Sequence, residues 1–357
     1  MTYEVGTATD HNDLLVKLRT FVEVTLPVAE RWVVQRTVEN TYDSISSITR
    51  LGTLATVTHA GNHLLMTGDR VTISGATDSL YNGTFSITVT TATTYTYTMT
   101  GIPAASPASG TLVEVRNSTE VIWKAPGLSA SEELYMGVKT YQLVSSDFYN
   151  WAVSGFTGYV STNNFDTQPG TSGMIGTPMW NQSIPYWFVG NGQGVVVVAK
   201  IQNTYNSVVM GKMLPYATPG QWPYPMIVGG ALTVAQKDFR YDNTAYINWF
   251  KGNRENFKMR HVDGTWHTPQ LLVQEETISI RNTITSSATA DGYYGLHALV
   301  ASEVSPPNVF GDIDNLYMIS GFNNATENTV VIGGITYVVF RDATRTGFKD
   351  YVALKLA

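Results

Sequence analysis

Helical periodicity is confined to one short segment of this sequence, and this restricts the chain to a mostly β fold. The segment lies near the N-terminus, where Asp10 is placed to cap a helix and Pro27 predicts that the helix ends by about Thr25. From residue 132 onward, short runs of β-forming residues alternate with Gly, Pro, Asn and Asp. We therefore predict an all-β chain with a single N-terminal helix. Its apolar face consists of residues that recur with a 3.6-residue period, namely Leu14, Leu15, Leu18, Phe21 and Val22.

Residues 53–115 differ in composition from both flanks. Sixteen of these 63 residues are Thr, and only four are charged. We predict that this segment is an inserted small β-sandwich or barrel, and that 1–52 and 116–357 together form one β-rich body with a sandwich or barrel-like fold. The β-forming runs Trp32–Arg36 and Val121–Lys124 flank the insert. They are expected to pair as a hairpin that the insert interrupts.

Alternation inside the insert predicts its strands, because every second residue of a strand points to the same face. The turn residues Tyr81–Thr84 predict a tight hairpin, and Ile102–Gly110 predicts a loop. The residues expected to share a face in each strand are Val71 with Ile73, Phe85 with Ile87 and Val89, Tyr95 with Tyr97 and Met99, and Val113 with Val115.

Three more hairpins and a final strand are predicted in the second half of the chain. The Asp263-Gly264 pair favours a two-residue type I′ turn, which would place His261 opposite Trp266 and send His267 to the other face. The last strand is expected at Tyr351–Leu356. The paired runs are Tyr186–Val189 with Val195–Ile201, Phe257–Val262 with Thr265–His267, and Thr329–Ile332 with Ile335–Arg341.

Charge and composition exclude several classes of function. The net charge is -6 without any cluster of Lys or Arg, so direct binding to nucleic acid is not expected. The chain has no Cys, which excludes disulfides and thiolate sites. No apolar run approaches the ~20 residues that cross a bilayer, and the N-terminal residues do not resemble a secretory signal. We expect a protein that folds in the bacterial cytoplasm and does not insert into a membrane.

Few charges and many aromatic residues indicate a surface that contacts other proteins. Charged residues make up 14 % of the chain, against roughly 25 % in typical soluble domains, and Tyr and Trp are enriched in interface cores. The proline-rich stretch Leu214–Pro225 predicts an ordered loop. Core packing is the alternative for its aromatic residues, and stacking on sugars is a second one. The candidate interface residues are Trp180, Trp187, Tyr216, Trp222 and Tyr224.

No pattern in the sequence predicts a cofactor, a metal site or a catalytic residue. His59 and His63 flank Gly61 and Asn62, which favour a loop. His261, Asp263 and His267 are interpreted as ordinary strand residues, because the predicted turn separates the two histidines. Asp312–Asn315 resembles the start of a calcium loop but lacks the Gly and Glu that an EF-hand requires.

Enzyme signatures are equally weak. No Gly-x-Ser-x-Gly motif occurs, and the Gly190–Gly194 run precedes a strand and not a helix, which favours a turn over a phosphate loop. Glycan cleavage needs two carboxylates held ~5 to 10 Å apart, a pattern that sequence alone neither shows nor excludes. Solvated charge is the expected role of the adjacent pairs Glu132–Glu133 and Glu275–Glu276.

Several segments resemble proteins of bacteriophage particles. The insert is similar to a small β-module that recurs in phage tail proteins, on the residues Thr67–Ala76, Tyr81–Phe85, Ala92–Tyr97 and Ser106–Thr111. The segments Phe156–Tyr159, Phe165–Gly170, Leu214–Gly220 and Tyr337–Asp342 with the stretch up to Leu356 resemble virion structural proteins of contractile-tailed and related phages.

This resemblance implies a structural subunit of the virion. We expect a non-enzymatic tail or baseplate component that assembles with other phage proteins and with copies of itself. Recognition of a host surface glycan, as in a receptor-binding fibre or decoration protein, is the alternative. A polysaccharide depolymerase is a third possibility.

Overall fold

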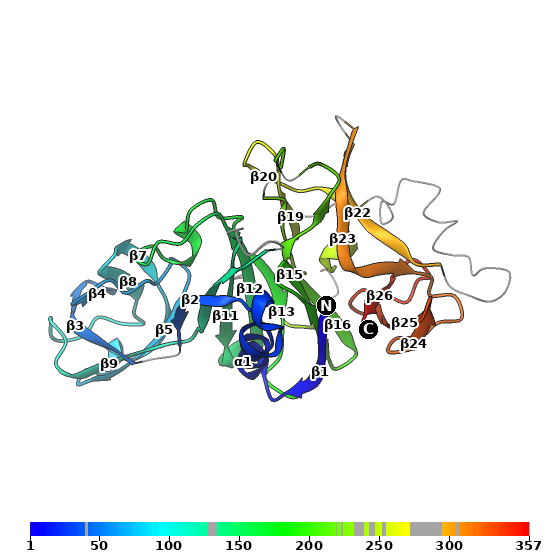
Figure 1. Cartoon of the computed structure of the whole chain (residues 1–357). Coiled ribbons are helices and arrows are strands. Elements are labelled where there is room, and N and C mark those ends of the chain that lie inside the picture. Colours follow the sequence, from blue (N-terminus) through cyan, green and yellow to red (C-terminus); the bar gives the residue numbers. More distant parts are fainter. Residues whose placement is uncertain are drawn as a thin grey trace.

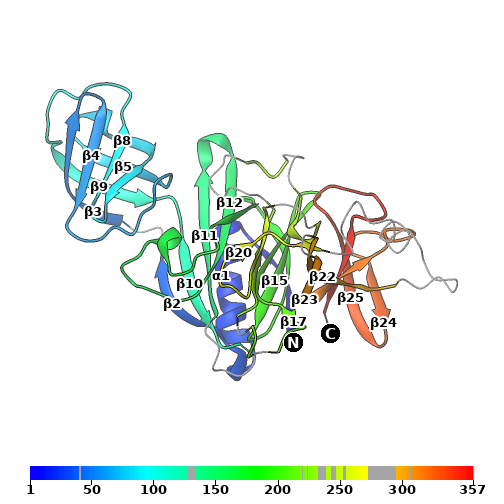
Figure 2. The same ribbon diagram turned by 90° about the horizontal axis from the view of Figure 1, so that it is seen from above.

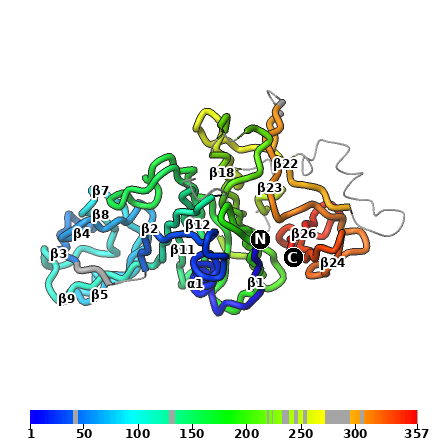
Figure 3. Tube along the Cα trace, viewed as in Figure 1, coloured from blue at the N-terminus to red at the C-terminus, as the bar shows by residue number. Residues whose placement is uncertain are grey.

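The computed structural model describes residues 1–39, 42–127, 134–218, 220–222, 224–231, 239–242, 247–251, 255–271, 295–304 and 307–356. Antiparallel sheets dominate these residues, together with one α-helix, which confirms the predicted all-β class. Figure 1 shows the sheets side by side, and the N- and C-termini lie close together in all three views (Figures 1–3).

The helix forms where the periodicity predicts it. It comprises α1 (His11–Thr20) and continues into one π-helical turn, η1 (Phe21–Thr25). The Asp10 carboxylate caps its first turn by accepting bonds from the backbone N–H groups of Asn12 and Asp13, at 2.7 and 2.9 Å. The predicted apolar face is fully buried. Short 3₁₀ turns occur at Val28–Glu30, Ser79–Tyr81, Val144–Ser146, Phe165–Thr167 and Trp249–Lys251.

Two sheets and the helix enclose the first core. The first sheet has the order β1-β14-β15-β16-β18-β19-β20, and the second β13-β12-β11-β10-β2. Trp123 and Trp151 of the second sheet belong to the same buried hydrophobic cluster as Phe188 of the first sheet. The strands of the first sheet are β1 (Thr2–Ala8), β14 (Ile184–Gly190), β15 (Gly194–Ile201), β16 (Thr204–Lys212), β18 (Met226–Gly229), β19 (Phe257–Arg260) and β20 (Trp266–His267). Those of the second are β2 (Val33–Val38), β10 (Glu120–Ala125), β11 (Leu134–Leu143), β12 (Phe148–Phe156) and β13 (Ile175–Pro178).

A third sheet covers the opposite face of the first one. Its order is β21-β22-β23-β26-β25-β24, and β17 pairs with β23. Val196 and Val198 of β15 pack against it, whereas Val195 and Val197 face the first core. Burial on both faces explains the unbroken valine run, because a strand with one solvent-exposed face would alternate apolar and polar residues. The strands are β17 (Leu214–Pro215), β21 (Gln270–Leu271), β22 (His297–Val304), β23 (Pro307–Ile319), β24 (Thr329–Ile332), β25 (Ile335–Arg341) and β26 (Tyr351–Lys355).

The Thr-rich segment folds around a hydrophobic cluster of its own, and this module projects from one side of the body (Figures 1 and 2). Its strand order is β6-β5-β9-β3-β4-β8-β7. Strand β3 pairs with both β4 and β9, so the sheet begins at Tyr42, before the expected boundary at residue 53. The strands are β3 (Tyr42–Leu51), β4 (Leu54–His59), β5 (Arg70–Ala76), β6 (Gly83–Ser86), β7 (Thr88–Thr91), β8 (Thr94–Thr98) and β9 (Gly110–Arg116).

Most of the predicted strand pairing is confirmed. Strands β2 and β10 pair across the insertion, β14 pairs with β15, and β24 pairs with β25 through Gly333 and Gly334. The final strand β26 is also present. Within the module, Val71 and Ile73 share one face of β5 and Tyr95 and Tyr97 one face of β8, as expected, and these residues and Met99 are buried.

Val113 and Val115 share one face of β9, as expected, and both are half-buried. The opposite face holds the buried side chains of Glu114 and Arg116, because Glu114 bonds with the buried polar groups of His59 and Tyr95. One prediction inside the module is wrong. The segment Tyr81–Thr84 is not a two-residue hairpin turn. The Asn82 side chain instead bonds with both the N–H and the C=O of Ala76, at 3.0 and 2.9 Å, and closes a longer loop.

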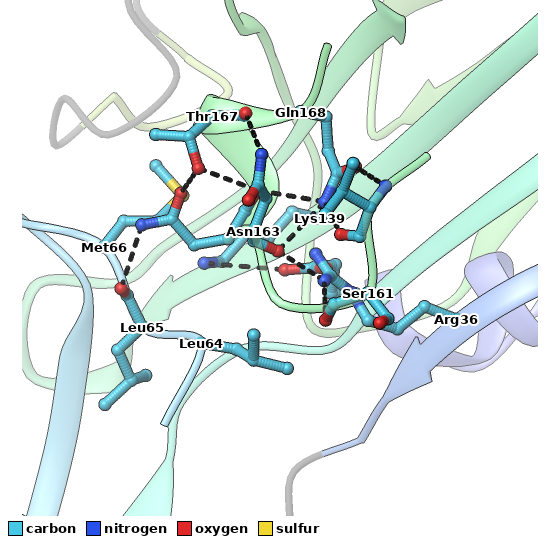
Figure 4. Close-up of polar contacts among 12 residues, drawn as sticks. Arg36, Leu64, Leu65, Met66, Lys139, Ser161, Asn163, Thr167 and Gln168 are labelled. Atoms are coloured by element: carbon cyan, nitrogen blue, oxygen red, sulfur yellow. Dashed lines mark hydrogen bonds and ion pairs between the residues drawn. The ribbon is translucent and has the colours of Figure 1, made fainter. Parts of the chain in front are cut away.

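A buried polar joint connects the module to the body. Lys139 Nζ of β11 lies 2.7 Å from Asp69 Oδ2, and both side chains are almost fully buried. Met66 packs beside this pair against aromatic residues of the second sheet. The segment after β12 completes the joint, since the Asn62 side chain of the module donates to the Thr162 carbonyl at 2.8 Å. Arg36 of β2 donates to the Asn163 carbonyl of the same segment at 2.6 Å (Figure 4).

Candidate functional site: an aromatic loop beside a histidine cluster

The proline-rich loop is attached to the third sheet at one end of its described part and to the first sheet at the other. Strand β17 pairs with β23, and the Tyr216 N–H donates to the Phe310 carbonyl at 2.8 Å. Gly311 makes this pairing possible, because a Cβ there would lie 2.2 Å from the Leu214 carbonyl oxygen. Trp222 anchors the other end, since its indole N–H donates to the Arg260 carbonyl at 3.1 Å. The described residues of the loop are therefore tied to both neighbouring sheets.

Three of the five candidate interface residues do not point freely to solvent. Trp222 is 2 % exposed and packs on Phe310, and Trp187 is 8 % exposed and packs on Phe340. Both rings fill the core between the first and third sheets, so the structure removes them as contact residues. Trp180 is half-buried and packs against Tyr241.

The other two candidates are exposed. Tyr216 is 57 % exposed, and Tyr224 is 36 % exposed. The Tyr216 hydroxyl donates to Asp312 Oδ1 at 2.7 Å, and this bond to a carboxylate raises the pKa of Tyr216 to about 12. The Arg260 guanidinium lies 5.7 Å from the centre of the Tyr224 ring. Both rings are thus held in defined positions.

Further exposed apolar side chains come from the segments that hold this loop. Leu214 precedes Tyr216, Val262 lies at the tip of the β19–β20 hairpin, and Val309 precedes Phe310 in β23. The hairpin and β23 are adjacent here, since the rings of His261 and Phe310 are 5.4 Å apart. We call these residues the contact face, which comprises Leu214, Tyr216, Tyr224, Val262 and Val309.

The β19–β20 hairpin differs from the predicted one by one residue in register. Arg260 pairs with Trp266, and the His261 N–H donates to the Thr265 carbonyl at 2.8 Å. The turn therefore contains three residues, the last of which, Gly264, has a φ of +88°. A shift of one residue moves side chains to the opposite face of a strand. The prediction that His261 lies opposite Trp266 is accordingly wrong.

This register brings three potential metal-ligand side chains of the same hairpin together. The rings of His261 and His267 lie face to face, with centroids 4.5 Å apart and an interplanar angle of 15°. Asp263 lies at the turn between them, and one ligand atom from each residue falls within 4.8 Å of the others. We call His261, Asp263 and His267 the histidine cluster. The sequence singles out these three residues, but the predicted two-residue turn would place the two histidines on opposite faces of the hairpin.

The other candidates for metal binding are not assembled into sites. His59 and His63 are both buried, and their rings are 5.5 Å apart. His59 Nε2 lies 3.1 Å from Glu114 Oε2, and the His63 ring nitrogens contact backbone atoms of Thr91 and Leu65. Both histidines thus have partners within the module. The pairs Glu132–Glu133 and Glu275–Glu276 lie outside the described residues.

The structure also shows the two segments that were compared with a phosphate loop and a calcium loop. Gly190–Gly194 forms a hairpin turn, as expected, with Asn191 Oδ1 accepting the N–H groups of Gln193 and Gly194. Asp312 to Asn315 lie within strand β23, where Asp312 bonds to Tyr216. Within the parts of the chain that the structure covers, no helix has the length and apolar character needed to span a bilayer.

Comparisons with known proteins identify no family for this chain. No family model matches it, and no curated protein matches its sequence. Among solved structures it aligns with "Phage phi92 endosialidase" at 12 % identity, with a TM-score of 0.23. The alignment covers 90 % of this chain and 52 % of that one, so the chain spans about half the length of that protein. A TM-score of this size is too low to indicate a shared fold.

Proposed function

We propose that this protein is a non-enzymatic structural subunit of a bacteriophage particle, in the tail or baseplate, and that it acts by assembly with neighbouring subunits. The contact face is the observation that carries the assembly role. It presents five exposed apolar or aromatic side chains from a loop, a hairpin and a strand that are bonded to one another. The phage assignment rests on the sequence resemblance of the Thr-rich module.

The fixed positions and the uncharged character of the side chains in the contact face both support a contact with another protein. Side chains that are already held in place lose little conformational entropy on binding, and Tyr216 is fixed by its bond to Asp312. Interface cores contain few charges and many Tyr residues. Identical subunits are the simplest neighbours, because closed symmetric homo-oligomers are the commonest protein assemblies.

The first test is quantitative mass spectrometry of purified particles of the phage that encodes the chain. We expect a fixed, low copy number relative to the major tail protein. Absence of the chain from intact particles would contradict the structural role.

A second test locates the contact. Val262→Asp places a charge on the contact face, and Val331→Asp is the matched control, because Val331 is equally exposed but lies in β24. We expect sedimentation or light scattering to show a smaller oligomer, or loss of incorporation into particles, for Val262→Asp alone. Equal behaviour of the two variants would exclude the contact face as the assembly surface.

Recognition of a host glycan is the second candidate function, favoured by the exposed rings of Tyr216 and Tyr224, since sugars stack on such rings. Specific adsorption of the purified protein to host cells, weakened by Tyr224→Ala, would support it. A depolymerase would instead release reducing sugar from host polysaccharide, which we do not expect.

A further inference from the structure

We propose that His261, Asp263 and His267 bind one divalent transition-metal ion of the zinc class. Both histidine side chains are partly buried, at 19 % and 34 % exposure, and the Asp263 carboxylate is 54 % exposed. One ligand atom from each residue lies within 4.8 Å of the other two, which is close enough for a single ion to contact all three after small side-chain movements. The inference concerns the fold of the hairpin tip and does not depend on the proposed phage function.

The separations between the ligand atoms fit a metal better than a direct hydrogen bond. His261 Nδ1 lies 3.6 Å from Asp263 Oδ1, and His267 Nε2 lies 3.9 Å from Asp263 Oδ2. Hydrogen bonds between such groups are about 2.7 to 3.2 Å long. Two ligands of a tetrahedral zinc ion, each bound at about 2.0 to 2.1 Å, are about 3.3 Å apart. Small side-chain rotations would close the remaining gap.

Glu303 orients one of the ligands. His267 Nδ1 lies 2.7 Å from Glu303 Oε1 of β22, which leaves Nε2 on the side of the turn, 2.9 Å from Thr265 Oγ1 and 3.9 Å from Asp263 Oδ2. Metal-binding histidines almost always donate their second ring N–H to a carboxylate or carbonyl, which fixes the tautomer. Glu303 is therefore a positioning residue for this site.

His261 offers a ring nitrogen that could coordinate a metal ion. Its Nδ1 is buried and has no hydrogen-bond partner among the described residues. The ring is held between Trp222 and Phe310, with centroid distances of 6.4 and 5.4 Å. A buried polar atom without a partner is destabilising, and coordination of a cation would satisfy it.

The donor set selects the class of ion. Two imidazoles and one carboxylate suit Zn²⁺, Co²⁺ or Ni²⁺, whereas Mg²⁺ and Ca²⁺ prefer oxygen ligands alone. A fourth position is left for water or for a group from a neighbouring molecule. Binding would tie the β19–β20 turn to His267, the last residue of β20, after which the chain passes from the first sheet to β21 in the third.

Thr265 provides the competing arrangement. Its Oγ1 lies 2.9 Å from His267 Nε2 and 2.7 Å from Asp263 Oδ1, so a purely hydrogen-bonded cluster also accounts for part of the geometry. In that case the residues would tie the turn together without any ion. The experiment must separate these two arrangements.

The test is calorimetric titration of the EDTA-treated, full-length protein with Zn²⁺, together with the visible absorption spectrum of its Co²⁺ complex. We expect one ion per chain, a spectrum typical of bound Co²⁺, and a higher Tm in the presence of Zn²⁺. His261→Ala, His267→Ala and Asp263→Asn should each weaken binding at least tenfold, and Glu303→Gln by about 10 to 100-fold.

His297→Ala is the matched control, since His297 lies on β22 at the far end from Glu303 and should leave binding unchanged. Asp263→Asn keeps the test valid if a histidine variant misfolds, because Asp263 is exposed and the amide oxygen retains the bonds from Thr265. The proposal is overturned if the wild-type protein does not saturate with Zn²⁺ or Co²⁺. Equal binding by wild type and Asp263→Asn would overturn it too.

Discussion

At the scale of single residues, burial of ionisable side chains is expected to make the stability of this protein fall in acid. His11 is 1 % exposed at the start of α1, and neither ring nitrogen has a hydrogen-bond partner within the described chain. Its removal from water lowers the pKa of His11 from 6.5 to about 4. Burial also lowers the pKa of His63. The folded state therefore holds these rings neutral at pH values where the unfolded chain is protonated.

We predict that His11 makes the protein less stable as the pH falls from about 6.5 to 4. The unfolded chain binds the proton near pH 6.5 and the folded chain only near pH 4, so acid favours unfolding within this window. The full effect is about 3 kcal/mol, because each pKa unit corresponds to about 1.4 kcal/mol. Urea titrations at pH 7 and 4.5 should show that the free energy of unfolding falls less between these pH values for His11→Leu than for wild type. An identical loss would contradict the assignment.

At the scale of elements, the module and the body are joined by a buried ion pair. Asp69 Oδ2 accepts from Lys139 Nζ and from the Met66 N–H, and Lys139 Nζ also lies 4.0 Å from Glu120. Glu120 in turn pairs with Arg36 of β2. A buried charge that loses its partner is costly, whereas replacing both partners costs much less.

We predict strong coupling between Asp69 and Lys139. Asp69→Asn and Lys139→Met should each destabilise the protein by about 3 kcal/mol, because each leaves a buried partner uncompensated. The double variant should cost clearly less than the sum of the two. Chemical denaturation of the four proteins measures this difference. Additive effects would show that the pair does not hold the joint together.

At the scale of the whole molecule, the module begins and ends at one place on the body. Val38 of β2 pairs directly with Glu120 of β10, so the two ends of the inserted chain leave neighbouring strands. The module has its own hydrophobic cluster, separate from the two clusters that fill the body. Whether it is an independent domain stays a prediction.

We predict that the body folds without the module. Replacing residues 39–119 with an Asn-Gly turn should close a β2–β10 hairpin, since this turn suits two directly paired strands. Lys139→Met belongs in the same variant, because Asp69 is removed with the module. The product should unfold cooperatively by circular dichroism. If the deletion variant unfolds non-cooperatively while the wild-type protein unfolds cooperatively, the body needs the module to fold.

Local signals in the sequence were sufficient for much of the fold. The period of the apolar residues and the cap at Asp10 predict α1, and Gly and Asn pairs predict the β14–β15 and β24–β25 hairpins. The pairing of β2 with β10 also follows from the sequence, because the change in composition marks the insertion between them. The helix and the two hairpins depend on neighbours along the chain, which the sequence shows directly, and the β2–β10 pairing joins two strands that become neighbours once the insertion is recognised.

Tertiary structure decided the features that depend on distant residues. The sequence offers Trp187, Trp222, Tyr216 and Tyr224 as equivalent aromatic candidates. The third sheet covers the two Trp side chains and leaves the two Tyr side chains exposed. The inward Glu114 depends on partners from β4 and β8. The histidine cluster depends on one residue of hairpin register and on Glu303 from another sheet. Such contacts arise only when separate elements pack, so no local pattern encodes them.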